Sequence, residues 1–388
     1  MKILSIDHLE FFVGDAKHVL DVFIRVLHMT MVAFSNQITG NYSYYSYVLQ
    51  SGKVKFVITT PQFGIKLNPH NNPPDPSFNS ELAYKWLNNH GSGVYAIAVH
   101  VENTHDSYNE AIANGAISFK PPYSITDSKN TVTIAEVKLY GDVVMRFVSY
   151  SDNYDCRYYP KYKPTQIDQS FDATLFTTVD HVVGNVPNMN DVIKYIKQFT
   201  GFNTFAKFSK EDIQTQWTSL NSEVLSNDTH NVLLPVNEPV HKEKLSQIQE
   251  FLTYNQGEGV QHIALKTFDI ITTVNSINLA NSKVISFLNV PPTYYETHHV
   301  RTILAKLPQE LAKNIVIHNI LVDEDDEGIL LQIFTKPIFD RPTIFFEFIQ
   351  RVCKSDKEIP GCGGFGKGNF KALFEAIEMI QQRRGNLY

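Results

Sequence analysis

Two histidines and one glutamate in the second half of the sequence have the donor types and the surroundings of a metal site. His181 lies in VDHVV, His262 in GVQHIAL and Glu347 in IFFEFI. The β-branched and aromatic residues around them are typical of β-strands. Two imidazoles and one carboxylate form a facial triad, which leaves open coordination positions on non-haem Fe(II). Zinc is also compatible with these donors, but the HExxH pattern of many zinc enzymes is absent.

Each of these three residues also has a purely structural explanation. A lone histidine in an apolar strand is more often a hydrogen-bonded core residue than a metal ligand. Glu347 fits that explanation less well, because a carboxylate between Phe346 and Phe348 would be costly to bury without a partner. The choice between the two explanations depends on whether the three positions are related to one another.

An internal repeat relates the three positions. Three pairs of segments align, namely residues 6–34 with 179–208, GVYAIAV at 93–99 with GVQHIAL at 259–265, and VVMRFV at 143–148 with IFFEFI at 344–349. Each member of the first two pairs carries or precedes a helix-like stretch. We therefore expect each half to contain two units of one strand, one helix and three strands, in an α+β fold with curved sheets and helices outside.

The repeat also indicates what the first half lacks. Its corresponding positions hold His8, Ala96 and Arg146. Ala96 has no donor atom, and a permanently charged guanidinium at position 146 would repel a metal ion. Corresponding strands of a duplicated fold can bring three donors together on one concave face. We therefore expect one metal site, in the second half only.

Length and composition fit a two-domain protein that acts on small molecules. The chain has 388 residues, of which 43% are hydrophobic and 19% charged, and its net charge is -6. No block rich in Lys and Arg is present, so neither nucleic acid nor a membrane surface is expected as a partner. We expect domains at residues 1–155 and 173–388, joined by a polar linker at residues 156–172 that is rich in Tyr and Pro.

The cysteines and the first residues bear on the cellular compartment. Cys156, Cys353 and Cys362 are too few and too scattered for a disulfide framework, which suits a reducing compartment. The sequence MKILSIDHLEFFV runs directly into strand-like residues without a cleavage-site pattern, and no apolar run reaches the ~18 residues of a membrane span. We therefore expect a cytoplasmic protein.

A glycine-rich segment near the end of the sequence, GCGGFGKGNF at residues 361–370, resembles phosphate-binding loops. No strand leads into it, and Gly368 stands where such a loop needs Ser or Thr, so nucleotide binding is not expected. Apolar residues then follow at helical spacing and predict a terminal helix. They are Phe370, Leu373, Phe374, Ile377 and Ile380. This helix could close over the site as a lid that excludes water, or it could simply pack on the sheet.

Neutral polar side chains recur in the second half, most of them at strand positions that can face inward. They are Ser222, Asn237, Gln247, Gln261 and Gln332. Each of them alone is more often structural or solvated. Around a metal ion, and with aromatic residues nearby, they would suit a polar aromatic ligand. The aromatic residues in question are Phe334, Phe345, Phe365 and Phe370.

Long motifs in the second half resemble the 4-hydroxyphenylpyruvate dioxygenase family. They are VDHVVGNV, the run from LNSEVL to VLLPVNEPVHK, KLSQIQEFL, GVQHIAL, FLNVPPTYY, DEGILLQIFTKP, RPTIFFEFIQR and GCGGFGKGNFKALFEAIE. The resemblance is weak over residues 1–150 and dense from about residue 173 onward. It implies a vicinal-oxygen-chelate fold, in which duplicated βαβββ modules form two open barrels and a C-terminal helix lies over the active-site barrel.

The resemblance also implies roles for individual residues. The set that binds one Fe(II) per subunit would be His181, His262 and Glu347. The catalytic set would be Gln261, Gln332 and Phe334. The substrate-binding set would be Ser222, Asn237, Gln247, Phe345, Phe365 and Phe370.

The implied activity is the conversion of 4-hydroxyphenylpyruvate to homogentisate and CO2 with Fe(II) and O2, in tyrosine and phenylalanine catabolism. The side chain of the substrate is decarboxylated and its ring is hydroxylated. The partners would be this small molecule and O2. A homodimer is expected, and a homotetramer stays open. The first domain would bind no metal and would serve structure and oligomerisation.

Three alternatives use the same scaffold. A 4-hydroxymandelate synthase has the same iron site and substrate but oxidises the benzylic carbon. Phe334, Asn237 and Pro235 resemble the dioxygenase more closely, so ring hydroxylation is favoured. An extradiol ring-cleaving dioxygenase and a catalytically silent protein that binds aromatic ligands are the other two alternatives.

Overall fold

The chain folds into two compact units. The computed structural model describes residues 1–64, 68, 70–166, 174–209, 215, 217–240, 244–355 and 360–386. By internal contacts, the first unit comprises residues 1–174, 194–202 and 255–259, and the second comprises residues 175–193, 203–254 and 260–388. Part of the expected linker, residues 167–172, lies outside the described residues, as does residue 173. The expected domain boundaries stay a prediction.

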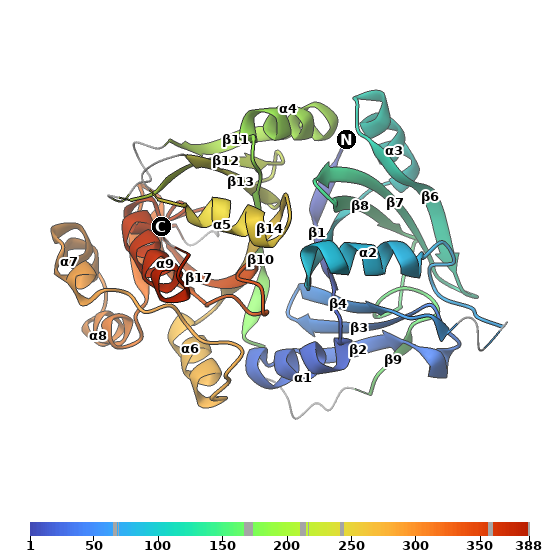
Figure 1. Ribbon diagram of the computed structural model, residues 1–388, viewed down its shortest axis with the longest axis horizontal. Coiled ribbons are helices and arrows are strands. Elements are labelled where there is room, and N and C mark those ends of the chain that lie inside the picture. Colours follow the sequence, from blue (N-terminus) through green and yellow to red (C-terminus); the bar gives the residue numbers. More distant parts are fainter. Residues whose placement is uncertain are drawn as a thin grey trace. The chain divides into compact units, whose positions relative to one another are not determined.

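The first unit contains two modules, each with the order strand, helix and three strands. The first module is β1 (Ile3–Phe12), α1 (Ala16–Leu27), β2 (Thr30–Ser35), β3 (Tyr44–Ser51) and β4 (Val54–Pro61). Next, α2 (Ser80–His90) leads to β5 (Gly93–Val101), α3 (Thr104–Ala113), β6 (Ser118–Thr126), β7 (Thr131–Tyr140) and β8 (Val143–Tyr150). With β9 (Lys163–Pro164), the strands form a mixed sheet of order β6-β7-β8-β5-β1-β4-β3-β2-β9. Helix α1 packs on β3 and β4 and α3 packs on β6 to β8, so both lie outside the curved sheet (Figure 1).

The second unit repeats this order and adds helices. Its first module is β10 (Phe176–Asn185), α4 (Met189–Thr200), β11 (Asn203–Phe208), β12 (Ser219–Ser226) and β13 (Leu233–Val240). After α5 (Gln247–Tyr254), the second module is β14 (Gly259–Thr267), α6 (Ile270–Leu279), β15 (Leu321–Glu324), β16 (Gly328–Phe334) and β17 (Phe345–Cys353). Two helices, α7 (His298–Leu304) and α8 (Gln309–Ile317), are inserted before β15, and α9 (Phe370–Arg384) follows β17. The sheet order is β11-β12-β13-β10-β14-β17-β16-β15.

Strand pairing confirms the alignment of the two halves. In the first unit β5 and β8 are parallel, and Ala98 pairs with Arg146. In the second unit β14 and β17 are parallel, and Ala264 pairs with Glu347. Arg146 and Glu347 therefore occupy corresponding places in the two sheets. The expected α+β fold of duplicated βαβββ modules is confirmed.

Local sequence explains why the helices lie where they do. The side chain of Asp15 accepts hydrogen bonds from two backbone N–H groups of the first turn of α1, and Asp269 does the same for α6. Such caps satisfy donors that have no partner inside the helix. Helix α1 then buries Val19, Val22 and Phe23 at helical spacing. The helix thus covers the outer face of the sheet with its apolar side.

Residues 156–166 of the expected linker are packed into the first unit. Tyr158 and Tyr159 are buried and belong to the same apolar cluster as Val132 and Ile134. The hydroxyl of Tyr158 lies 3.2 Å from Nε2 of His8. Strand β9 also pairs with β2. The polar composition of this stretch indicated an exposed connection, but its aromatic rings are buried in the barrel.

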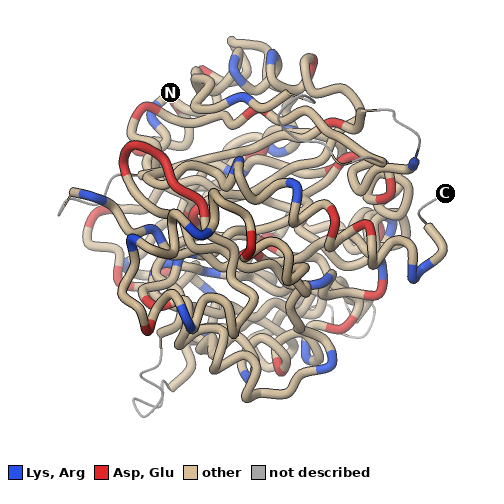
Figure 2. The backbone as a smooth tube through the Cα atoms, turned by 90° about the vertical axis from the view of Figure 1, so that its left-hand side faces the viewer, with Lys and Arg blue, Asp and Glu red and all other residues tan. Residues whose placement is uncertain are grey.

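Charged positions are spread over the backbone of both units, and Figure 2 shows acidic positions interspersed with basic ones. The longest acidic run of the sequence is DEDDE at residues 323–327, in β15 and the turn that follows it. Within the described part of the chain, no helix is both long and apolar enough to cross a membrane.

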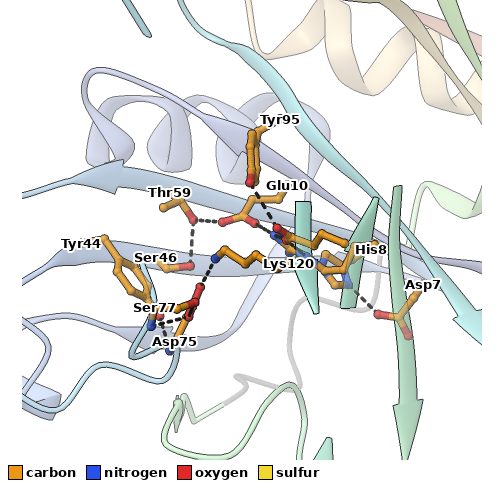
Figure 3. Close-up of polar contacts among 12 residues, drawn as sticks. Asp7, His8, Glu10, Tyr44, Ser46, Thr59, Asp75, Ser77, Tyr95 and Lys120 are labelled. Atoms are coloured by element: carbon orange, nitrogen blue, oxygen red, sulfur yellow. Dashed lines mark hydrogen bonds and ion pairs between the residues drawn. The ribbon is translucent and has the colours of Figure 1, made fainter. Parts of the chain in front are cut away.

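The interior of the first unit holds an ion cluster centred on Arg146. Its guanidinium donates to Oε1 of Glu136 at 2.7 Å and lies 2.6 Å from Oε2 of Glu10. Nη1 of Arg146 lies 3.2 Å from Nε2 of His8, whose Nδ1 lies 2.6 Å from Asp7 (Figure 3). The place that holds Glu347 in the second unit is therefore filled by a cation that two carboxylates neutralise.

Lowering the pH from about 7.5 to about 5.5 is expected to destabilise the first unit through His8. Burial lowers the pKa of His8 from its ordinary 6.5, and Arg146 adds to this effect, although Asp7 and Glu10 oppose it. The remaining polar group that faces the ring, the hydroxyl of Tyr158, is uncharged at these pH values. Below the ordinary pKa the unfolded chain binds a proton that the folded chain does not, so stability falls by up to about 1.4 kcal/mol per pH unit.

The measurement is chemical denaturation of the wild type and His8→Gln at several pH values in that range. The free energy of unfolding should fall less with acidification in the variant than in the wild type. If the free energy of unfolding falls equally with pH in both proteins, His8 is not the group that causes the loss of stability.

Candidate metal centre

Three neighbouring strands bring His181, His262 and Glu347 together. Strands β10, β14 and β17 are adjacent in the sheet of the second unit. Nε2 of His181 lies 3.2 Å from Oε2 of Glu347, and Nε2 of His262 lies 3.4 Å from the same oxygen. One donor atom of each residue lies within 4.8 Å of the others. Ligands at about 2.0–2.2 Å from one ion are spaced in this way, so the group could hold a single metal ion.

His181 and Glu347 are buried, His262 is largely buried, and the electrostatics of the three side chains suit a cation. Burial by itself lowers the pKa of His181, but hydrogen bonds to Asp180 and Glu347 outweigh it and raise this pKa to about 9. Burial lowers the pKa of His262. Burial by itself raises the pKa of the Glu347 carboxyl, but the two histidines outweigh it and hold this pKa below the ordinary value. Glu347 is therefore ionised and available as an anionic ligand.

Neighbouring polar groups fix the orientation of both imidazoles. Nδ1 of His181 lies 2.9 Å from Oδ1 of Asp180, and Nδ1 of His262 lies 2.9 Å from Oε1 of Gln261. Arg351 in turn donates to both carboxylate oxygens of Asp180 at 2.8 Å. Such partners hold the ligating nitrogen toward the ion and raise its basicity. The Nε2 atoms of both histidines are thereby directed to Glu347.

A chain of hydrogen bonds fixes Glu347 from the other side. Nε2 of Gln332 donates to Oε1 of Glu347 at 2.9 Å, and Nδ2 of Asn369 donates to Oε1 of Gln332 at 3.0 Å. The hydroxyl of Tyr294 donates to Oδ1 of Asn369 at 2.6 Å. Asn369 lies immediately before α9, so the chain links the terminal segment to the three donors.

A small cavity of about 70 Å³ opens at the three donors. All the residues that the sequence analysis assigned to the site line it, including those on α5, on the glycine-rich loop and on α9. They are His181, Ser222, Asn237, Gln247, Gln261, His262, Gln332, Phe334, Phe345, Glu347, Phe365 and Phe370. The ring of Phe345 stacks on His262, with centroids 4.9 Å apart. The cavity therefore combines three potential metal ligands with amide and hydroxyl groups and phenylalanine rings.

Comparison with known proteins places the chain in a family. No family model matches the chain. A 4-hydroxyphenylpyruvate dioxygenase from Arabidopsis thaliana is 41% identical over 398 residues, which cover 98% of this chain and 88% of that protein. Proteins of the same name from Pyricularia oryzae and Xenopus tropicalis are each 35% identical, over 98% and 100% of this chain and 91% and 93% of their own length.

The chain belongs to the 4-hydroxyphenylpyruvate dioxygenase family. The resemblance inferred from the sequence motifs is thereby confirmed. A solved structure of a triple mutant of 4-hydroxymandelate synthase from Streptomyces coelicolor has a TM-score of 0.78 at 23% identity, and the match covers 98% of this chain and 100% of that one. This likeness supports the expected vicinal-oxygen-chelate fold.

Sequence reasoning missed several residues of this dioxygenase site. Asp180 precedes His181 as Asp7 precedes His8, so the repeated Asp-His pair was an available signal. Arg351 carried no signal, because its partner Asp180 is 171 positions away. The cavity also includes apolar residues that no motif singled out. They are Val183, Phe208, Leu220 and Val224, whereas Leu373 and Phe374 belong to the apolar face predicted for the terminal helix.

The glycine-rich loop of the dioxygenase is tied to the acidic run of β15 and its turn. Oδ1 of Asp325 accepts from the backbone N–H of Gly363 at 3.0 Å, and Oδ2 of Asp323 accepts from that of Gly368 at 2.8 Å. Nη1 of Arg351 donates to the carbonyl of Gly364 at 2.8 Å. The glycines have a structural reason: Gly363 and Gly366 have positive φ, and a Cβ there would lie 2.7 Å from the backbone N of Leu330 and 2.1 Å from Oε1 of Gln332.

One expectation about the cysteines is wrong. Cys353 at the end of β17 and Cys362 in the glycine-rich loop form a disulfide. They appeared too few and too scattered for a disulfide framework, but the Cα atoms of Cys353 and Cys362 lie 5.8 Å apart. Cys156 is free.

Gly366→Ala is expected to lower kcat by about 10- to 100-fold, as loss of a residue that supports a metal ligand does. A Cβ at Gly366 would lie 2.1 Å from Oε1 of Gln332, so Gln332 would be displaced from Glu347. Gly364→Ala is the matched control. Both glycines have positive φ, +71° and +73°, but the nearest atom to a Cβ at Gly364 is 3.7 Å away, on Asp325.

Steady-state oxygen consumption of the iron-loaded variants measures the difference. Backbone strain of about 1–2 kcal/mol should lower the stability of both variants alike, whereas only Gly366→Ala should lose kcat. Equal loss of kcat in both variants would show that strain, not the contact with Gln332, decides the effect.

Proposed function

We propose that the chain converts 4-hydroxyphenylpyruvate and O2 to homogentisate and CO2, as an iron-dependent dioxygenase of tyrosine and phenylalanine catabolism. The observation that carries the proposal is the convergence of two imidazoles and one carboxylate in a buried, phenylalanine-lined cavity. The relatives named 4-hydroxyphenylpyruvate dioxygenase, which are up to 41% identical in the matches described above, support the same substrate.

The donor set fits Fe(II), one ion per subunit. His181 and His262 would supply nitrogen donors, with a bound ion displacing the proton of His181, and Glu347 would supply one carboxylate. This is the 2-His-1-carboxylate set of non-haem Fe(II) oxygenases. Zinc stays compatible with the same atoms. When bound here, Fe(II) would supply the electrons that activate O2 and open positions for the α-keto acid.

The side chains around the donors would bind and orient the substrate. Ser222, Asn237 and Gln247 offer hydroxyl and amide groups that can bond the substrate's phenol and side chain. Gln261 and Gln332 hold His262 and Glu347 in place by hydrogen bonds of 2.9 Å, so we assign them catalytic roles in the broad sense of holding the reacting geometry. Holding reactants in one geometry is itself a large contribution to rate.

The phenylalanine rings would fix the aromatic ring and exclude water. Phe334 and Phe345 flank His262, with ring centroids 6.2 Å and 4.9 Å from it. Phe365 lies 5.4 Å from His181, and Phe370 lines the same cavity from the start of α9. A dry cavity protects a reactive oxidant from side reactions. We assign Phe334 to the catalytic set and the other three to substrate binding.

The terminal segment would act as a lid. The cavity of about 70 Å³ is much smaller than the about 300–1,000 Å³ of typical ligand pockets. Phe365, Phe370 and Leu373 form part of its wall, so outward movement of the loop and α9 would enlarge it. We therefore propose that this segment opens for the substrate and closes during turnover.

The closing experiment is anaerobic reconstitution of the purified protein with Fe(II), followed by addition of O2 and 4-hydroxyphenylpyruvate. We expect one CO2 per O2 consumed and homogentisate as the aromatic product. Hydroxymandelate as product would favour the alternative activity of a 4-hydroxymandelate synthase, a protein whose mutant has the same fold with a TM-score of 0.78. Turnover of a catechol would indicate ring cleavage, and a lack of oxygen uptake with bound ligand would indicate a silent binding protein.

The remaining proposals concern organisation. We propose that residues 1–155 form a metal-free domain for structure and oligomerisation and that residues 173–388 form the catalytic domain. A homodimer stays our prediction for the assembly, and a homotetramer stays open. A cytoplasmic location also stays a prediction, supported by a content of only three cysteines, and reduction of the Cys353–Cys362 disulfide would be expected there.

A further inference from the structure

The first unit contains a cavity that no role in the proposed reaction explains. Its volume is about 510 Å³, within the about 300–1,000 Å³ typical of pockets for small organic molecules. Every residue that lines it belongs to the first unit. The cavity at the metal donors measures only about 70 Å³. A folded barrel does not ordinarily leave so large a space among packed side chains.

Aromatic rings make up much of the wall. They include Phe12, Trp86, Tyr95, Phe119, Tyr123 and Tyr159. Phe12 and Tyr95 stack with centroids 4.1 Å apart, and Trp86 meets Tyr95 edge to face at 6.3 Å. Such rings favour a second aromatic system in stacked or edge-on contact. The shape and chemistry of the wall therefore select a flat aromatic ligand.

The charges that line the cavity are already paired. The pairs are Arg146 with Glu10 at 2.6 Å, Lys120 with Asp75 at 2.7 Å and Lys138 with Asp142 at 3.3 Å. Figure 3 shows Lys120 directed to Asp75, and Glu10 bonded to Thr59 as well. Lys85, the remaining charged residue of the wall, is exposed to solvent. An ionic ligand would lose its hydration here without meeting an unpaired counter-ion, so a neutral ligand is favoured.

One polar group of the wall lacks a partner. The hydroxyl of Tyr159 is buried and has no hydrogen-bond partner within the described residues. Its residue is 5% exposed, and its ring stacks on Tyr158 with centroids 4.0 Å apart. A buried hydroxyl without a partner carries a desolvation cost that a ligand oxygen would remove. The cavity thus offers one specific hydrogen bond in an aromatic surround.

We propose that this cavity binds a small uncharged aromatic molecule that carries one hydroxyl or carbonyl oxygen. The ligand's ring packs among Phe12, Trp86 and Tyr95, and its oxygen bonds the hydroxyl of Tyr159. The site is separate from the metal donors, which belong to the second unit, and it does not depend on the proposed reaction. The first unit then serves as a binding domain for neutral phenol-like compounds.

The experiment uses the iron-loaded full chain under anaerobic conditions, with 4-fluorophenol as the probe and fluorine NMR as the readout. We expect saturable binding that persists when 4-hydroxyphenylpyruvate saturates the second unit. Tyr159→Phe should weaken 4-fluorophenol binding about 10-fold, the effect of one lost hydrogen bond. The same variant should leave binding of fluorobenzene, which has no hydroxyl, unchanged. 4-Fluorophenylacetate, which is anionic, should bind at least about 10-fold more weakly than 4-fluorophenol.

A second variant tests the cavity itself. Ala83 lies on α2, is buried and lines the cavity, so Ala83→Phe would fill part of the space. It should weaken both neutral probes by at least about 10-fold. If this variant does not fold, the comparison of Tyr159→Phe with the wild type still tests whether the cavity binds 4-fluorophenol through the Tyr159 hydroxyl. The proposal is overturned if 4-fluorophenol does not bind, if 4-hydroxyphenylpyruvate displaces it, or if Tyr159→Phe has no effect on it.

Discussion

Replacing His262 with alanine is expected to abolish iron retention and oxygen consumption, whereas replacing His8 is expected to preserve both. His262 is one of three side chains whose donor atoms lie within 4.8 Å of one another, and its Nε2 lies 3.4 Å from Glu347. Loss of a residue that only supports a metal ligand costs about 10- to 100-fold in affinity, so loss of a ligand should exceed about 100-fold. His8 occupies the corresponding position of the first unit, but its neighbour there is Arg146.

Metal analysis of the purified variants after reconstitution with Fe(II), together with oxygen uptake, measures this difference. His8→Ala is the matched control, because it removes a buried histidine from the same type of strand. A thermal unfolding scan would separate loss of iron from loss of the fold. Equal iron loss in both variants would refute the assignment of the metal to the second unit.

Replacing Arg351 with methionine is expected to lower the free energy of unfolding by about 3–5 kcal/mol, the cost of leaving one partner of a buried ion pair alone. The Arg351 side chain is 1% exposed and binds both carboxylate oxygens of Asp180. Burial acts to raise the pKa of Asp180, but Arg351 and His181 hold this pKa well below its ordinary value. Without Arg351, Asp180 would be a buried charge paired only with His181. Iron affinity should fall by about 10- to 100-fold, because Asp180 orients a ligand.

The double variant Arg351→Met with Asp180→Asn is the control for this prediction. It removes the unpaired charge, so much of the lost stability should return. Iron affinity should stay low, because the asparagine is a weaker partner for Nδ1 of His181 than a carboxylate is. Chemical denaturation and metal titration together separate the two effects. Wild-type stability in Arg351→Met alone would contradict the role given to this pair.

The donors and the fold class were predictable from sequence because the information is local and repeated. The β-branched and aromatic residues around His181, His262 and Glu347 specify strands, and strand geometry sends alternate side chains to one face. The duplication then places these strands in corresponding positions, with Ala264 beside Glu347 as Ala98 is beside Arg146. Residue type and strand period were therefore sufficient to predict that the donors meet.

The contacts that orient those donors were decided only by the tertiary structure. Arg351 meets Asp180 across 171 positions, and Asn369 meets Gln332 across 37. Gln332 was predicted to belong to the site, but nothing in the sequence indicates that Asn369 or Arg351 would be the partners, because a one-dimensional pattern carries no information on where a loop returns.

The tertiary structure alone also decided the disulfide and the packing of the tyrosines in the first unit. Cys353 and Cys362 pair because the fold brings their Cα atoms to within 5.8 Å of each other. Tyr158 and Tyr159, in a stretch with the composition of a linker, are buried because they pack on apolar side chains such as Val132 and Ile134. Local sequence thus determined which side chains could do chemistry and on which strands they lie. The tertiary structure decided which groups orient those side chains. Contacts between segments far apart in the sequence depend on the whole fold and not on the local spacing of apolar residues.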